Sequence, residues 1–289
     1  MGTMVVGVDG SPGAAAALAW AIDAARARDA SVKAVHSWTP VLTGDVYGVV
    51  MVDTAALEDA ARATLDESVD GADTSGLRAP VERVIVLGPA TGGLIQQAQH
   101  ADLIVVGSRG RGGFAGLLLG SVSHQLVQHA PCPVVVVPAE WKRPADRRIV
   151  VGVDGSDGAA AALRWALEWA GPAAAQVEVV LAFDSDVAWI DVGTHDEAEW
   201  VERGKATAEA VVRRIVDEVA AGRAGEDVHP VVAEGAPARV LLDRAQDADL
   251  LVVGTRGRGG FAGLLLGSVS QRCAEHAPCP VAVVPAPVG

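Results

Sequence analysis

The sequence has few cysteines, no basic leader segment and no long hydrophobic run, and each absence excludes a class of protein. Three cysteines, Cys132, Cys273 and Cys279, cannot build a disulfide framework, and an odd number is typical of a reducing compartment. No basic segment precedes the apolar residues 4–8, and Val6 stands where a myristoylation signal needs Ser or Thr. Apolar runs such as Val134–Val137 are far too short to span a bilayer. We therefore expect a soluble, cytoplasmic protein without membrane insertion.

The chain is also poor in positive charge. Its 23 Lys and Arg residues stand against 36 Asp and Glu residues, which gives a net charge of −13 at pH 7. Such a chain repels phosphate backbones at long range, so we expect no nucleic-acid partner. Half of the residues are hydrophobic, which excludes a disordered chain, and 289 residues suffice for two domains that each bury a core.

The sequence contains the same pattern twice. Residues 102–139 and 249–286 agree at 30 of 38 positions, and the segments that begin at Val5 and Val150 also match. A charged, proline-containing segment lies between the two copies. These features predict a first domain over residues 1–140 and a second over residues 148–289.

Each copy alternates strand and helix patterns. Ser11 is a suitable N-cap and Pro12 suits the first helical position, so a helix is predicted to begin there and end near Asp29. Continuous Val/Ile/Leu runs that alternate with helices predict an α/β fold: two tandem doubly wound domains, each a five-stranded parallel sheet with helices on both faces. The other expected elements of the first copy are strands at 4–9, 32–37, 81–87, 102–107 and 134–137 and helices at 55–69, 90–99 and 121–129; the expected strands of the second copy lie near 149–154, 177–182, 228–233, 249–254 and 281–284.

A glycine-rich loop follows the fourth strand of each copy. In the first copy Gly107 and Gly110 begin the loop, and Gly120 and Ser121 end it at a helix start. Glycines allow backbone N–H groups to point at an anion, and a helix N-terminus favours phosphate. Arg109 adds positive charge. Ligands bind doubly wound sheets where the winding reverses, so this loop and the turn after the first strand are expected to form one pocket. The loop residues of the second copy are Gly254, Arg256, Gly257, Gly267 and Ser268.

The loop also has features in common with three other kinds of glycine-rich segment. A tight turn alone would also need glycine. A P-loop ends in Gly-Lys-Ser/Thr, whereas no lysine stands here, which argues against vigorous hydrolysis. A dinucleotide fingerprint should follow the first strand and not the fourth. Likewise, Asp9 and Asp154 each precede a Gly-Ser pair and are expected either to contact a ligand or to serve as turn and cap residues.

The spacing of the loop glycines, together with Val-Asp-Gly-Ser after the first strand, resembles the universal stress protein family, and specifically its tandem ATP-binding type from actinobacteria. The resemblance implies that Asp9 and Asp154 meet adenine, and that the ends of the second strands, at Ser37 and Ala182, close the adenine slot. It further implies that the remaining site residues line the pocket or hold ribose and phosphates: Gly7, Val8, Ser121, Val122 and Ser123 in the first copy, and Gly152, Val153, Ser268, Val269 and Ser270 in the second. The family's last strand usually makes the dimer contact, so Val134–Val137 and Val281–Val284 are expected to pair within one chain as a pseudo-dimer, with a further homodimer left open.

The leading hypothesis is therefore an ATP-binding stress-response protein with one site per domain, no catalytic residue and at most slow hydrolysis. No Cys/His cluster has the spacing of a metal site, so any Mg²⁺ would enter with the nucleotide phosphates. The protein partner that would respond to the nucleotide is unknown. Two alternatives stay open: an ATPase or nucleotidyl-transfer enzyme of the same wider fold, and a non-catalytic scaffold that binds another adenine nucleotide.

Overall fold

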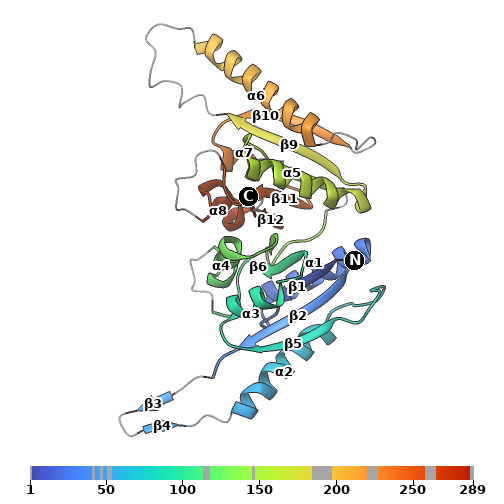
Figure 1. The fold of residues 1–289 in the computed structure, drawn as a ribbon, viewed down its shortest axis with the longest axis vertical. Helices are drawn as coiled ribbons and strands as arrows, with labels where there is room; N and C mark the ends of the chain where they lie inside the picture. Colours follow the sequence, from blue (N-terminus) through green and yellow to red (C-terminus); the bar gives the residue numbers. More distant parts are fainter. Residues whose placement is uncertain are drawn as a thin grey trace. The chain divides into compact units, whose positions relative to one another are not determined.

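The computed structural model describes residues 2–40, 43–45, 48–50, 54–112, 118–144, 147–183, 197–219, 227–257 and 265–286. The chain divides into two compact units, Met1–Glu140 and Trp141–Gly289. Strands and helices alternate along both units (Figure 1).

Unit 1 begins with a strand and closes on a strand. Its strands are β1 (Thr3–Gly7), β2 (Ser31–Trp38), β3 (Thr43–Asp45), β4 (Gly48–Val50), β5 (Glu82–Leu87), β6 (Leu103–Gly107) and β7 (Val134–Val137). Its helices are α1 (Pro12–Arg28), α2 (Thr54–Asp70), α3 (Ala90–Gln97) and α4 (Ser121–His129).

Unit 2 repeats this order without a counterpart of β3 and β4 among its described residues. Its strands are β8 (Arg148–Gly152), β9 (Gln176–Phe183), β10 (Val228–Glu234), β11 (Leu250–Gly254) and β12 (Val281–Val284). Its helices are α5 (Asp157–Ala170), the short 3₁₀ helix η1 (Gly171–Ala173), α6 (Glu197–Val219), α7 (Pro237–Arg244) and α8 (Ser268–His276).

Five parallel strands form the sheet in each unit. The order is β7-β6-β1-β2-β5 in unit 1 and β12-β11-β8-β9-β10 in unit 2. The winding reverses beside the first strand of each unit, where β1 lies between β2 and β6. Right-handed crossovers on either side of that reversal put helices on opposite faces, and α3 packs against α4 on one of them. The predicted fold class is confirmed.

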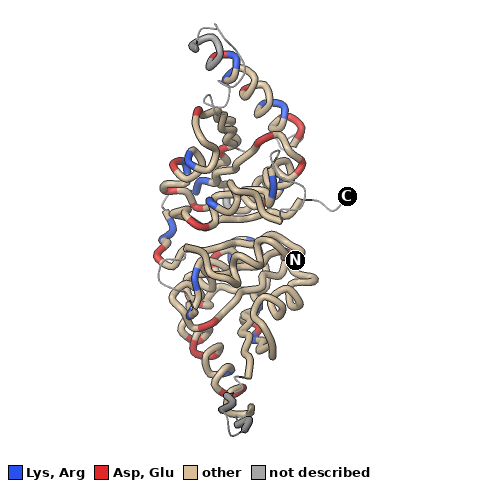
Figure 2. The backbone as a smooth tube through the Cα atoms, turned by 90° about the vertical axis from the view of Figure 1, so that its left-hand side faces the viewer, with Lys and Arg blue, Asp and Glu red and all other residues tan. Residues whose placement is uncertain are grey.

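The central strands are buried on both faces, which explains their uninterrupted apolar sequence. Val5, Val6 and Val105 are fully shielded from solvent, and so are Val150 and Val252 in the second unit. Helix α6, in contrast, carries charged residues of both signs along its length (Figure 2). No helix in the described part of the chain is long and apolar enough to cross a membrane.

Local capping positions the turn after β1. The Ser11 hydroxyl accepts a hydrogen bond from the N–H of Ala14, and Pro12 begins α1, as the sequence predicts. Ser156 caps α5 in the same way through Ala159. One segment differs from expectation: the connection after β2 was expected to be a loop, but β3 and β4 pair as an antiparallel hairpin, with Thr43 opposite Val50. Its strands are only three residues long, too short for a periodic hydrophobic pattern to indicate.

Candidate functional site

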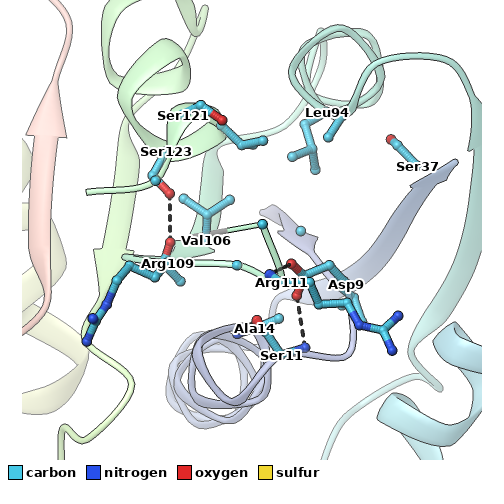
Figure 3. A pocket seen from close by; sticks show the side chains of 18 of the residues that line it. Asp9, Ser11, Ala14, Ser37, Leu94, Val106, Arg109, Arg111, Ser121 and Ser123 are labelled. Carbon is cyan, nitrogen blue, oxygen red and sulfur yellow. Dashed lines mark hydrogen bonds between the residues drawn. The ribbon is translucent and has the colours of Figure 1, made fainter. Parts of the chain in front are cut away.

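A cavity of about 470 Å³ opens at the carboxyl ends of β1, β2 and β6 in unit 1 (Figure 3). It has a volume typical of small-molecule sites. The eleven site residues that the sequence predicts for this unit all line it: Gly7, Val8, Asp9, Ser37, Gly107, Arg109, Gly110, Gly120, Ser121, Val122 and Ser123.

Unit 2 has a matching cavity of about 480 Å³. Ten predicted residues line it: Gly152, Val153, Asp154, Gly254, Arg256, Gly257, Gly267, Ser268, Val269 and Ser270. Ala182 does not contribute to this lining, although it is the penultimate residue of β9, the position that Ser37 occupies in β2. The two cavities are therefore alike at the glycine loop and different at the end of the second strand.

One side of the first cavity is hydrocarbon. Val35, Leu94 and Val106 form it from β2, α3 and β6. Gly7 keeps this slot open, because a Cβ there would lie 3.0 Å from Val106 Cγ1 and 3.1 Å from Leu94 Cδ1. The sequence reasoning missed this side, and Ala90 and Leu94 of α3 in particular. The order of elements could have indicated these two residues, because α3 begins at the carboxyl end of β5, at the edge of the sheet where the cavity opens.

Asp9 joins the two loops that frame the cavity. Its Oδ1 accepts a hydrogen bond of 3.0 Å from the N–H of Ser11, and its Oδ2 accepts one of 2.9 Å from the N–H of Arg111 (Figure 3). In unit 2 Oδ1 of Asp154 accepts from both the N–H and the hydroxyl of Ser156. Turn and cap chemistry is therefore present at both aspartates. Each oxygen of the Asp9 carboxylate accepts one of these hydrogen bonds and has a second lone pair, so a further donor can be accommodated there.

Backbone donors at the start of α4 also line the cavity. Gly120 precedes α4 without a side-chain cap, so the N–H groups of Ser121, Val122 and Ser123 in the first turn donate no hydrogen bond to a capping side chain. The N–H of Gly120 is already used, because it donates to Ser108 O at 2.8 Å. Gly267 precedes α8 in the same uncapped way. Uncapped N–H groups and the helix dipole make both helix starts suitable for an anion.

Two predicted loop residues have structural roles as well. The Ser123 hydroxyl donates to Gly107 O at 2.7 Å, and that of Ser270 donates to Gly254 O at 2.6 Å. The hydroxyl protons of Ser123 and Ser270 are therefore already used in hydrogen bonds within the protein. The hydroxyl groups of Ser121 and Ser268 are exposed and can donate to a ligand. Gly107 is required by a close approach: a Cβ on it would lie 2.5 Å from the backbone carbon of Gly13 in α1.

The two arginines of the first loop lie differently. The side chain of Arg109 points away from the cavity, whereas that of Arg111 lies beside Asp9 (Figure 3). Arg109 thus contributes its main chain to the lining and its charge to the local field. No group of three or more His, Cys, Asp or Glu side chains suited to a metal ion occurs among the residues that the structure covers.

Comparisons with known proteins match this architecture. The sequence model of the universal stress protein family matches twice, over residues 1–138 and 146–285. The chain is 34% identical over 295 residues to universal stress protein Rv2623 of Mycobacterium tuberculosis, covering 97% of this chain and 95% of that protein. A universal stress protein of Mycolicibacterium smegmatis is also 34% identical over 295 residues, at 97% and 96% coverage.

A solved structure shows the same fold. The crystal structure of a universal stress protein from Archaeoglobus fulgidus superposes with a TM-score of 0.70 at 20% identity, covering 99% of this chain and 96% of the other. Two matches to one family model, on two units that each carry the same cavity, indicate a tandem arrangement. The chain belongs to the universal stress protein family.

Proposed function

We propose that this protein binds ATP, with one site in each unit, and uses the bound nucleotide as a signal. The observation that supports this most is the composition of a single cavity. The hydrocarbon side chains of Val35, Leu94 and Val106 and the uncapped start of α4 line the same cavity. A nucleotide combines the two groups that suit such a lining: a flat base for the hydrocarbon side chains and anionic phosphates for the helix start.

The residues present fit such a ligand. The buried hydroxyl of Ser37 has no hydrogen-bond partner in the part of the chain that the structure describes, so a polar group on the ligand would satisfy it. Gly120 leaves the helix start open to phosphate oxygens, and Ser121 offers a hydroxyl beside it. Mg²⁺ would be held through the phosphates and not by a set of protein side chains.

The proposed role is binding without efficient catalysis. The loop carries no lysine to contact a transferring phosphate. Asp9, a carboxylate of the first cavity, already accepts two backbone hydrogen bonds and holds the loops together. We therefore expect hydrolysis far below the roughly 1 per second of ordinary enzymes. Binding would change the order of the glycine loop and so the surface presented to a protein partner.

The first test is the content of the purified protein. Denaturation followed by chromatography and mass determination should release about two adenine nucleotides per chain, mostly ATP. Mostly ADP would favour the ATPase alternative and would be followed by a turnover assay. Absence of nucleotide, combined with no binding in an ATP titration, would overturn the proposal.

A second test blocks the helix starts. In a Gly120→Glu, Gly267→Glu variant, carboxylates would accept from the first-turn N–H groups in place of phosphate, and ATP affinity should fall at least about 10-fold. The new Cβ at Gly120 meets Ser108 O at 3.4 Å, an ordinary contact, so the fold should persist. Gly171→Glu is the matched control for each of the two substitutions made singly, because it adds one negative charge where a Cβ meets nothing within 4 Å.

A further inference from the structure

The two cavities differ at one buried hydroxyl. In unit 1 Ser37 lies near the end of β2, lines the cavity and directs its hydroxyl towards the side formed by Leu94 (Figure 3). Its Oγ is buried and, among the described residues, has no hydrogen-bond partner. A buried polar atom without a partner destabilises the protein, so such an atom beside a cavity indicates that a ligand supplies the missing hydrogen bond.

The surroundings of Ser37 keep this hydroxyl in place. A Cβ on Gly93 of α3 would lie 2.6 Å from Ser37 Oγ, so any other residue at position 93 would displace the hydroxyl. Gly93 is itself buried within a short helix, where glycine is intrinsically unfavourable. The close contact gives a physical reason for glycine at this position.

Unit 2 has the opposite pair of residues. Ala182 stands in β9 where Ser37 stands in β2, and Val240 stands in α7 where Gly93 stands in α3. Val240 is buried, with an exposed fraction of 9%. The second unit therefore has no hydroxyl at this position of the strand, and it has the hydrocarbon side chain of Val240 where the first unit has glycine.

We propose that the two nucleotide sites are not equivalent, and that the Ser37 hydroxyl contacts the base in the first site alone. The inference rests on the proposed function, because it assumes that a nucleotide occupies both cavities. A serine hydroxyl both donates and accepts, so it can pair with a ring nitrogen or an exocyclic amine on the edge of adenine. The second site holds its base through apolar contacts at this position and discriminates less between bases.

The experiment isolates each site in the full-length chain. Gly267→Glu leaves the first site to be measured, and Gly120→Glu leaves the second. Ser37→Ala is then added to the first-site protein, and calorimetric titrations use ATP and, as a probe that lacks a base, inorganic tripolyphosphate. Alanine occurs at this position in unit 2, so the variant should fold. Ser31→Ala, at the other end of β2, is the matched control.

We expect Ser37→Ala to weaken ATP binding at the first site roughly 5- to 10-fold, the effect of one lost hydrogen bond, and to leave tripolyphosphate binding unchanged. The same variant should melt at a higher temperature without nucleotide, because an unpaired hydroxyl has been removed. A purely structural role for Ser37 would not produce these two changes together. In the second-site protein, Ala182→Ser with Val240→Gly should bind ATP several-fold more tightly than Val240→Gly alone.

The outcomes separate this inference from the proposed function. ATP binding that is unchanged by Ser37→Ala, or that falls in parallel with tripolyphosphate binding, overturns the inference and leaves the proposed function intact. Failure of both single-site proteins and of the unmodified protein to bind ATP overturns both. Equal weakening by Ser31→Ala and Ser37→Ala would show a general effect of β2 and would also overturn the inference.

Discussion

The main-chain N–H of Arg111 donates a hydrogen bond of 2.9 Å to Oδ2 of Asp9, which lies 102 residues earlier in the chain. The other oxygen of the same carboxylate accepts from the N–H of Ser11. A single side chain therefore sets the distance between the turn after β1 and the glycine loop after β6. These two segments frame the first cavity, so its shape depends on a contact that neither segment makes by itself.

Asp9→Asn should loosen this connection. An amide can accept through only one of its two terminal atoms, so an N–H donor at Ser11 or Arg111 would face an NH₂ group. We expect the free energy of unfolding to fall by about 1–2 kcal/mol, together with faster hydrogen exchange at the Arg111 amide. Urea unfolding and exchange measured by mass spectrometry check both effects. Exposed Asp59→Asn on α2 is the control, and equal effects of the two variants would contradict the role given to Asp9.

Gly107→Ala should destabilise unit 1 through backbone crowding. The added Cβ would lie 2.5 Å from the carbonyl carbon of Gly13 and 2.7 Å from its oxygen, so α1 would have to move away from β6. Such overpacking lowers stability by about 1–3 kcal/mol. Gly112→Ala, in the same loop, meets nothing within 4 Å and should leave the urea midpoint nearly unchanged. A midpoint for Gly107→Ala equal to that of the control would exclude the close approach.

Glu178→Gln should lower the stability of unit 2 by about 2 kcal/mol. The Glu178 carboxylate is 12% exposed and accepts from Arg148 at 3.1 Å and from Arg244 at 2.7 Å, so its neutralisation leaves two cations without their partner. In unit 1 Glu82 pairs with Lys33 at 3.5 Å and is 60% exposed. Glu82→Gln should change stability by no more than about 0.5 kcal/mol, because solvent screens such pairs. Thermal unfolding of both variants measures the difference, and similar losses would contradict this explanation.

We expect the protein to lose stability at high pH because its three cysteine thiols are buried. Burial raises the pKa of the Cys132 thiol to about 11 and those of Cys273 and Cys279 to about 12. Unfolded thiols ionise near a pKa of about 8.5, so above that pH the unfolded state releases protons that the folded state keeps. The free energy of unfolding should therefore fall with rising pH, by about 1.4 kcal/mol per pH unit for each thiol, until the folded pKa is reached.

Cys273→Ala isolates the contribution of one thiol. Urea unfolding at several pH values between about 8.5 and 10.5 should give a slope that is shallower by about 1.4 kcal/mol per pH unit than that of the unmodified protein. The substitution also leaves a cavity, which lowers stability by the same amount at every pH and does not change the slope. Identical slopes for the two proteins would show that Cys273 ionises normally in the folded state.

Most strands and helices of this fold could be predicted from the sequence, because they depend on residues that are close together along the chain. The Val-rich segments of β1, β6 and β7 are buried on both faces, and an uninterrupted apolar run is a direct consequence of that environment. Ser11 and Pro12 begin α1 because capping and the fixed φ of proline act within a few residues. The hairpin of β3 and β4 was missed because strands of three residues carry no period.

Some residues of the candidate site could likewise be predicted from the sequence, and others could not. Glycine spacing and the Asp-Gly-Ser turn indicated which loops line the cavity, since those patterns are continuous in the sequence. The hydrocarbon side at Val35 and Leu94 was not indicated, because an apolar residue in a strand or helix has the same pattern whether it meets the core or a cavity. The engaged hydroxyl of Ser123 was also missed, since its acceptor is the carbonyl of Gly107, in the preceding strand.

The sequence by itself determined that the chain is a repeated α/β unit with a glycine loop before its fourth helix, because repeats, caps and apolar periods depend on neighbours along the chain. Only the tertiary structure decided that Gly93 leaves room for the buried hydroxyl of Ser37, which has no partner among the described residues, and that Val240 is buried at the matching position of the second unit. The physical reason is that packing and hydrogen bonding join atoms that are close in space but distant along the chain, and no local pattern encodes which of them meet.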